Sequence, residues 1–89
     1  MSQRKNPFMP TKKFKSEISG VEYTLQKVAP RPWLKLMDEW DDKGKTNEKL
    51  TEIVFEHVVV DPKVSIDDFE DYAEVEELSM AAYRFQRGK

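Results

Sequence analysis

The hydrophobic pattern of the chain changes its period once, at two closely spaced prolines, and this change limits the folds that are open to it. Before the prolines, between Lys12 and Val28, apolar and polar residues alternate, which is the period of a half-buried β-strand. A Ser19-Gly20 link divides this segment, and glycine supplies the positive φ that tight turns between strands need. The alternation therefore predicts a β-hairpin, which has to pack on another element because a lone hairpin is marginally stable in water.

After Pro30 and Pro32 the period becomes that of an α-helix. Proline is accepted in a first helical turn, because the N–H that it lacks would have no partner there. The apolar residues that follow are spaced i, i+3, i+4 and i+7 and form one stripe: Trp33, Leu36, Met37 and Trp40. Gly44 suits the left-handed conformation in which many helices end. We therefore predict a first helix between Pro30 and Gly44.

A second helix is expected to start at Thr46 or Asn47, either of which can cap it. Its expected apolar face comprises Leu50, Ile53, Val54, His57 and Val58. The valines at 58–60 precede Asp61-Pro62, and proline disfavours helical geometry in the residue before it. The helix is therefore predicted to end before Asp61 and to be followed by an extended link.

The last part of the chain is predicted to be helical as well. Ser65 and Asp68 have the spacing of a capping box, which marks the start of a helix. The apolar positions expected along it are Phe69, Tyr72, Val75, Leu78, Ala82 and Phe85. The segment 65–87 forms either one bent helix or two short ones. The expected fold is α+β: a small single domain with an N-terminal β-hairpin followed by three short helices.

Charge is distributed unevenly along the chain. Residues 1–15 hold five basic residues and no acid, whereas residues 61–79 hold eight acids and one lysine. We interpret residues 1–11, which have two prolines and no periodic pattern, as a flexible basic arm. Residues 12–89 form the domain, since 89 residues leave no room for a second. The acids are interpreted as a solvated helix face.

Composition argues against several functional classes. The chain has no cysteine and three glycines, none of them in a phosphate-binding pattern, which excludes thiolate metal sites and nucleotide-binding loops. His57 is the only histidine, and Glu56 beside it is expected to face another way on a helix. We therefore predict no catalytic residue, no cofactor and no metal, and a protein that is not an enzyme. No signal peptide and no apolar run of about 18 residues is present, so no membrane partner is expected.

Aromatic residues on the first and last predicted helices are candidates for a binding surface. Tryptophan and methionine are enriched in protein interfaces, but tryptophan in a small domain is most often part of the core, and both interpretations remain open. The candidate partner-binding residues are Trp33, Met37, Trp40, Tyr83 and Phe85. Arg84 and Arg87 are close to Tyr83 and Phe85 in the sequence. Aromatic residues interleaved with arginines can stack on the bases of single-stranded nucleic acid, but arginines at the end of a helix also offset the helix dipole.

Four segments carry a resemblance to a known family. In residues 55–63 (FEHVVVDPK), the end of the expected helix is followed by three valines and, after Asp61, by a Pro-Lys pair. Residues 66–71 (IDDFED) then form an acidic stretch with one aromatic residue. The strand at 23–28 and the helix start at 33–36 complete the pattern. Over residues 21–85 the chain resembles the small tail assembly chaperones of siphophages and related prophages. It departs from them at Pro30-Arg31-Pro32, where a Ser- or Asp-capped helix start is expected.

The resemblance implies a non-enzymatic protein of the bacterial host cytoplasm. Such proteins bind the long helical tape measure protein and keep it soluble until tail tube subunits polymerise around it. It implies the tail tube protein as a further partner, contacted by a longer frameshifted form. A second copy of the chain is a separate candidate partner. The alternative is a small nucleic-acid-binding regulator that uses the basic N-terminal arm, although the net charge of -2 argues against nucleic acid. A third option is a component that stays in the virion.

Overall fold

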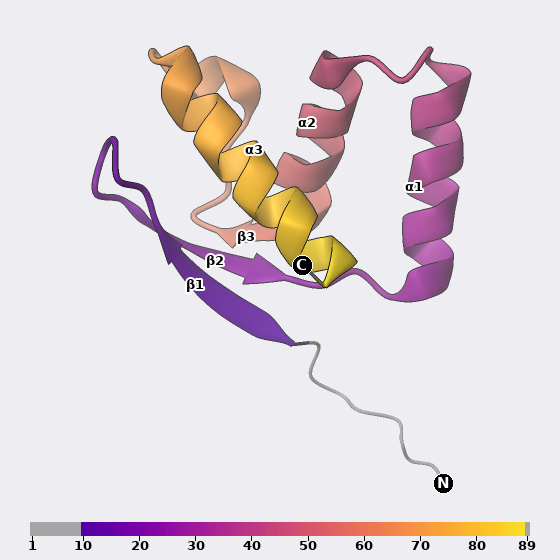
Figure 1. Cartoon of the computed structure of the whole chain (residues 1–89), viewed down its shortest axis with the longest axis horizontal. Helices are drawn as coiled ribbons and strands as arrows, with labels where there is room; N and C mark the ends of the chain where they lie inside the picture. Colours follow the sequence, from indigo (N-terminus) through magenta and orange to yellow (C-terminus); the bar gives the residue numbers. More distant parts are fainter. Residues whose placement is uncertain (1–9, 89) are drawn as a thin grey trace, which may run out of the picture.

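A computed structural model describes residues 10–88 as a three-stranded antiparallel sheet with helices on one side of it (Figure 1). The elements in chain order are β1 (Thr11–Lys15), β2 (Glu22–Gln26), α1 (Pro30–Asp42), α2 (Asn47–His57), β3 (Val59–Asp61), the 3-10 helix η1 (Ile66–Asp68) and α3 (Tyr72–Arg87). The predicted α+β class and the order of hairpin and helices are confirmed. Residues 1–9 of the predicted arm (residues 1–11) lie outside the described residues. The last residue assigned to the arm, Thr11, is the first residue of β1.

The predicted hairpin is formed by β1 and β2, with Phe14 opposite Tyr23. Its loop is longer than the predicted two-residue link, because β1 ends at Lys15 and β2 begins only at Glu22. Gly20 has a φ of 79°, in agreement with its expected place in the turn.

Ser16 is the last residue that pairs across the hairpin, since its N–H donates to the carbonyl oxygen of Val21 at 2.9 Å, while its oxygens bond within the loop. Its carbonyl oxygen accepts from the N–H of Gly20 at 2.9 Å, and its Oγ accepts from the N–H groups of Ile18 and Ser19, both at 3.1 Å. Serine side chains that bond to nearby backbone groups compete with strand pairing. Residues 16–21 therefore form a structured loop, called the hairpin loop below.

The link expected after the second helix is a third strand. β3 pairs with β2, and Val59 lies opposite Leu25. The carbonyl oxygen of Val58 also accepts from the N–H of Gln26 at 2.8 Å, so pairing begins directly where α2 ends. Beyond the strand, the Lys63 ammonium donates to the carbonyl oxygens of Glu56 and Val59, and a cation there offsets the dipole of α2.

The helices begin and end at the signals expected of them, except in the last segment. Thr46 caps α2 by accepting from the N–H of Lys49 at 3.2 Å, and Gly44 has a φ of 84° after the end of α1. The segment 65–87 consists of two helices, η1 and α3, with a short extended connection between them. Asp71 caps α3 by accepting from the N–H of Ala73 at 2.9 Å, which explains why α3 starts afresh at this point.

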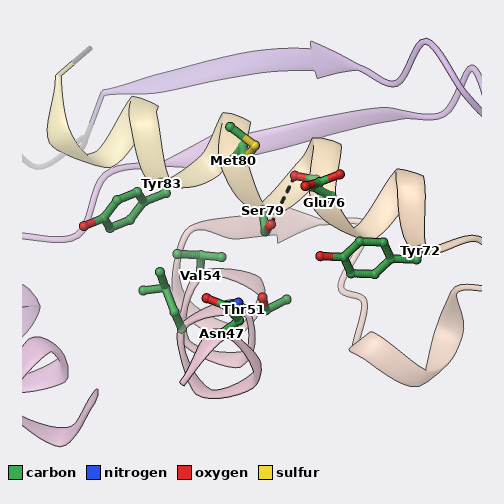
Figure 2. Close-up of a pocket in the computed structure, with 9 residues that line it drawn as sticks. Asn47, Thr51, Val54, Tyr72, Glu76, Ser79, Met80 and Tyr83 are labelled. Atoms are coloured by element: carbon green, nitrogen blue, oxygen red, sulfur yellow. Dashed lines mark hydrogen bonds between the residues drawn. The ribbon is translucent and has the colours of Figure 1, made fainter. Parts of the chain in front are cut away.

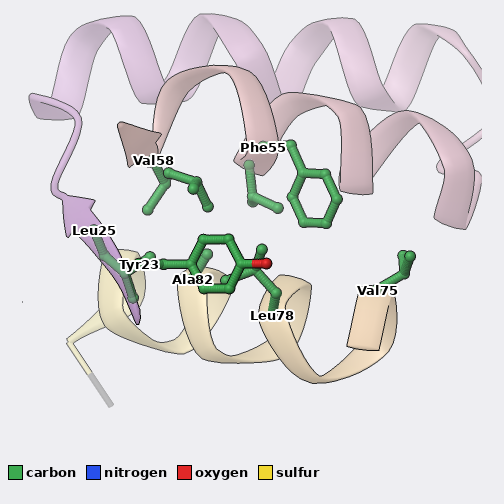
Figure 3. Packing of buried hydrophobic residues seen from close by; sticks show 9 residues of the cluster. Tyr23, Leu25, Phe55, Val58, Val75, Leu78 and Ala82 are labelled. Atoms are coloured by element: carbon green, nitrogen blue, oxygen red, sulfur yellow. The ribbon is translucent and has the colours of Figure 1, made fainter. Parts of the chain in front are cut away.

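The hydrophobic core lies between α2, α3 and the sheet (Figure 3). Its buried side chains are Tyr23, Leu25, Val54, Phe55, Val58, Val59, Val75, Leu78 and Ala82. α2 lies between this cluster and α1, so α1 is an outer layer of the molecule (Figure 3). None of the side chains of α1 is fully buried, although Trp33 packs against the edge of the core.

Glu77 on α3 holds the hairpin loop against the helix. Its Oε1 accepts from the Ser16 hydroxyl at 2.6 Å, and its Oε2 accepts from the Glu17 N–H at 2.8 Å. Ser16 is 2% exposed, so its hydroxyl has little access to water as an alternative partner. One carboxylate therefore joins residues that lie about 60 positions apart in the chain and fixes the hairpin on α3.

Glu74, one turn earlier on α3, makes the second connection to the hairpin. Its Oε2 accepts from the Ser19 hydroxyl at 2.6 Å and from the Tyr23 hydroxyl at 2.8 Å. Burial raises the pKa of Tyr23 above its ordinary value of 10.0, and the hydrogen bond to Glu74 raises it further. The phenol is therefore held neutral in the folded state.

We expect this phenol to make the fold sensitive to alkali. The unfolded chain loses the Tyr23 proton near pH 10, whereas the folded chain keeps it to higher pH. Stability linked to this group is therefore complete below about pH 10 and falls as the pH rises above it. Tyr23→Phe should show a smaller loss of unfolding free energy between about pH 9 and 11, measured by urea titration with far-UV circular dichroism. Tyr72→Phe is the exposed control, and equal pH slopes for both variants would contradict the expectation.

Candidate functional site

Two of the five candidate binding residues, Trp33 and Tyr83, meet where the start of α1 approaches the end of α3. The rings of Trp33 and Tyr83 lie 6.3 Å apart between centroids and are tilted by 44°. The Arg87 guanidinium lies 5.3 Å from the centroid of the Tyr83 ring, and the Lys27 ammonium lies 5.3 Å from that of Phe85. Trp33, Tyr83 and Phe85 are all half-buried at the edge of the core, and the contact between Trp33 and Tyr83 joins α1 to α3.

The other two candidates lie farther along α1. Trp40 is near the end of the helix, where its indole N–H donates to the carbonyl oxygen of Thr46 at 2.8 Å. The Lys45 ammonium lies 5.9 Å from the centroid of its ring. Met37 is half-buried one turn before Trp40. The structure therefore brings Trp33 and Tyr83 together but does not gather all five candidates into one surface.

The basic residues near the N-terminus do not form one face in the part of the chain that is described. Side chains alternate along a strand, so Lys13 and Lys15 lie on the sheet face opposite that of Lys12 and Phe14. The Lys13 ammonium donates to the Thr24 hydroxyl at 2.9 Å. The basic residues of the predicted arm, Arg4 and Lys5, lie outside the described residues.

A hollow between α2 and α3 is the feature that the sequence did not indicate (Figure 2). It has a volume of about 190 Å³ and adjoins a second hollow of about 500 Å³ beside η1, and the two share Asn47, Thr51 and Tyr72. We call the combined depression the α2–α3 groove. Its walls include Leu50, Thr51 and Val54 of α2 and Tyr72, Met80 and Tyr83 of α3. Of the five candidate residues, only Tyr83 lines it.

The groove leaves large apolar side chains in contact with solvent. Tyr72 is 70% exposed and Met80 is 47% exposed, whereas Val54 at the floor is fully buried. Tyr72 and Tyr83 lie toward the two ends of the α3 wall, and Thr51 and Val54 lie opposite on α2 (Figure 2). Isolated exposed apolar residues are ordinary, but several along one depression are typical of a binding surface. Tyr72 was predicted as an apolar position of its helix, but nothing in its spacing showed that it would stay exposed.

The charges that border the groove are negative. Glu48 and Glu70 line the hollow beside η1, and Glu76 lines the other. No lysine or arginine is among the described residues that line either hollow. Carboxylates around an apolar depression favour a partner that is apolar at its centre and basic at its edges.

His57 differs from its predicted place on the apolar face of the second helix, because it is exposed at the end of α2. Its Nε2 lies 3.7 Å from a carboxylate oxygen of Glu56, the neighbour that was expected to face another way. Within residues 10–88, no group of three or more His, Asp or Glu residues is placed to hold a metal ion, and no helix is long and apolar enough to cross a membrane. No family model matches the chain, and no curated protein or solved structure matches it either.

Proposed function

We propose that this chain is a non-enzymatic phage tail assembly chaperone, which binds the tape measure protein and keeps it soluble while the tail tube forms. The observation that supports the proposal is the α2–α3 groove, with exposed Tyr72 and Met80 on its wall and carboxylates at its border. The resemblance of residues 21–85 to that family supplies the identity of the partner. The host cytoplasm, where tails are assembled, is the corresponding location.

The groove has the form that such a task needs. Its two hollows are open and follow two helices, which suits a segment of a polymer better than an enclosed small molecule. A tape measure protein exposes apolar helical stripes over a great length, and each stripe is prone to association in water. Many copies of a small domain, each covering one stretch, would keep it apart from other chains. Weak single contacts suffice, since repeated sites along one partner add avidity.

Co-expression with the tape measure protein of the same tail gene cluster tests the proposal. We expect the soluble fraction of the tape measure protein to rise several-fold, and the two proteins to remain together in a nuclease-treated pull-down. Their association should persist when the salt is raised from about 0.1 M to about 0.5 M, because apolar contact is little screened. Nucleic acid that is retained at low salt and lost at high salt would overturn the proposal in favour of a regulator that uses the basic arm. Recovery of the chain from purified virions would favour a structural component instead.

A further inference from the structure

We propose that the α2–α3 groove binds one amphipathic helix whose apolar stripe is flanked by lysine or arginine. This inference rests on the proposed function for the biological partner, a segment of the tape measure protein. It deepens that function by assigning the contact surface to the groove rather than to the tryptophans of α1. It also specifies the charge that the bound segment has to carry.

The dimensions of the groove match a short helical segment. Tyr72, Met80 and Tyr83 are spaced i, i+8 and i+11 along α3, so they belong to one side of the helix. At a rise of 1.5 Å per residue, Tyr72 and Tyr83 are about 16 Å apart along the axis, the length of three helical turns. On the facing wall, Leu50 and Val54 of α2 are spaced i and i+4. Two roughly facing helical stripes with a depression between them are the usual receptor for a third helix.

The side chains that would contact the helix are available to a partner. Tyr72 and Met80 are 70% and 47% exposed, and a partner's apolar side chains would remove them from water. Aromatic and thioether side chains are enriched in protein interfaces, and methionine adapts its shape to different partners. Replacement of Met80 by a charged residue would place an unpaired charge in the contact.

The carboxylates at the border of the groove favour basic residues on both sides of the apolar stripe of the bound helix. Glu48 is in the first turn of α2, Glu70 precedes α3, and Glu76 is on the α3 wall, so carboxylates border the groove on both helices. Lysine or arginine beside the partner's apolar stripe would lie near these groups, and acidic flanks would be repelled. The same carboxylates disfavour a phosphate backbone.

A second copy of this chain is a poorer occupant than a basic helix. The exposed apolar residue of its outer helix is Leu34, which is 63% exposed on α1. The end of α1 carries Asp38, Glu39, Asp41 and Asp42. Arg31 and Lys35 lie beside Leu34, but these four acids outnumber them, so docking of the whole of α1 into another copy's groove would bring a net negative helix against carboxylates.

Binding of a designed peptide tests the inference directly. The probe is a fluorescein-labelled helix of about 18 residues with a leucine stripe flanked by lysines, and its twin has glutamate at every lysine position. We expect fluorescence anisotropy to show binding of the lysine peptide, with the glutamate twin at least about tenfold weaker. Met80→Glu should weaken the lysine peptide at least about tenfold, and Leu34→Glu, outside the groove, should leave it unchanged. Circular dichroism confirms that each variant is folded.

A charge reversal gives the sharper outcome. In the double variant Glu70→Lys and Glu76→Lys, the preference should shift toward the glutamate twin. No binding of either peptide by the wild type, an unchanged preference in the double variant, or equal losses from Met80→Glu and Leu34→Glu would each overturn the inference. Dimers that form at the probe concentration and compete with the peptide would identify a second copy as the occupant and overturn it too.

The inference and the proposed function can fail separately. If Met80→Glu still solubilises the tape measure protein as well as the wild type does, the groove is the wrong surface and the chaperone function stands. If the wild type binds the lysine peptide but does not solubilise the tape measure protein, the groove stands and the proposed function is wrong.

Discussion

Replacement of Phe55 by alanine is expected to lower the free energy of unfolding by about 3–5 kcal/mol, the largest effect of any single substitution considered. Phe55 is 1% exposed in the last turn of α2, and its ring centroid lies 5.5 Å from that of Phe69. Alanine would leave a cavity and remove this aromatic contact as well. A domain of 89 residues has a total stability of about 4–13 kcal/mol, so the loss is a large share of it.

Urea unfolding followed by far-UV circular dichroism measures this loss. Glu56→Ala, at the next position of α2, is the control, because its side chain is exposed and alanine favours helix. Its unfolding midpoint should stay close to that of the wild type. A loss below about 1 kcal/mol for Phe55→Ala would mean that the core is packed differently from the arrangement in Figure 3.

Replacement of Glu77 by alanine is expected to lower the free energy of unfolding by about 2–3 kcal/mol, although the side chain is only half-buried. The carboxylate accepts from the Ser16 hydroxyl and from the Glu17 N–H, and its removal leaves the hydroxyl of a buried serine without its partner. Hydrogen bonds to a charged acceptor are stronger than those between neutral groups. The hairpin loop would consequently lose its attachment to α3.

Glu76→Ala is the matched control for this substitution. Glu76 is the preceding residue of the same helix and is exposed, and no side-chain hydrogen bond of its carboxylate is found within residues 10–88. Its substitution should change the stability by less than about 0.5 kcal/mol. Equal urea midpoints for the two variants would show that the attachment of the loop contributes nothing. Amide hydrogen exchange at Ile18 and Ser19 gives a second measurement, which should accelerate only in Glu77→Ala.

The features of the fold that could be predicted from the sequence are those determined by neighbouring residues. The change of period at Pro30, the threonine cap at Thr46 and the left-handed Gly44 are all local signals, and each was found where it was expected. The length of the hairpin loop was missed because apolar and polar residues keep alternating through Ser16 and Ile18, so the pattern does not show where strand pairing ends. The attachment of the loop to α3 by Glu77 is a contact between distant residues, which no local signal indicates. β3 has three residues, too few for alternation to distinguish a strand from an extended link.

The candidate site was harder to predict because it depends on how the helices pack. The stripe of Trp33, Met37 and Trp40 was recognisable from its spacing, but the packing of the helices brings Trp33 against Tyr83 and leaves Met37 and Trp40 farther along α1. The groove lies between two helices, and the hydrophobic periodicity of each helix does not show how closely the two helices pack. Tyr72 has the spacing of a core residue, yet it remains exposed because α2 and α3 do not close over it.

The position of α1 as an outer layer has a consequence for spectroscopy. Both tryptophans of the chain, Trp33 and Trp40, belong to this helix, whose side chains are at most half-buried. Helices with few buried contacts open at a lower free energy than the core that they cover. We therefore expect intrinsic fluorescence to follow the detachment of this helix and circular dichroism to follow the loss of the whole structure. Two probes that usually give the same unfolding curve should then give two different midpoints in this molecule.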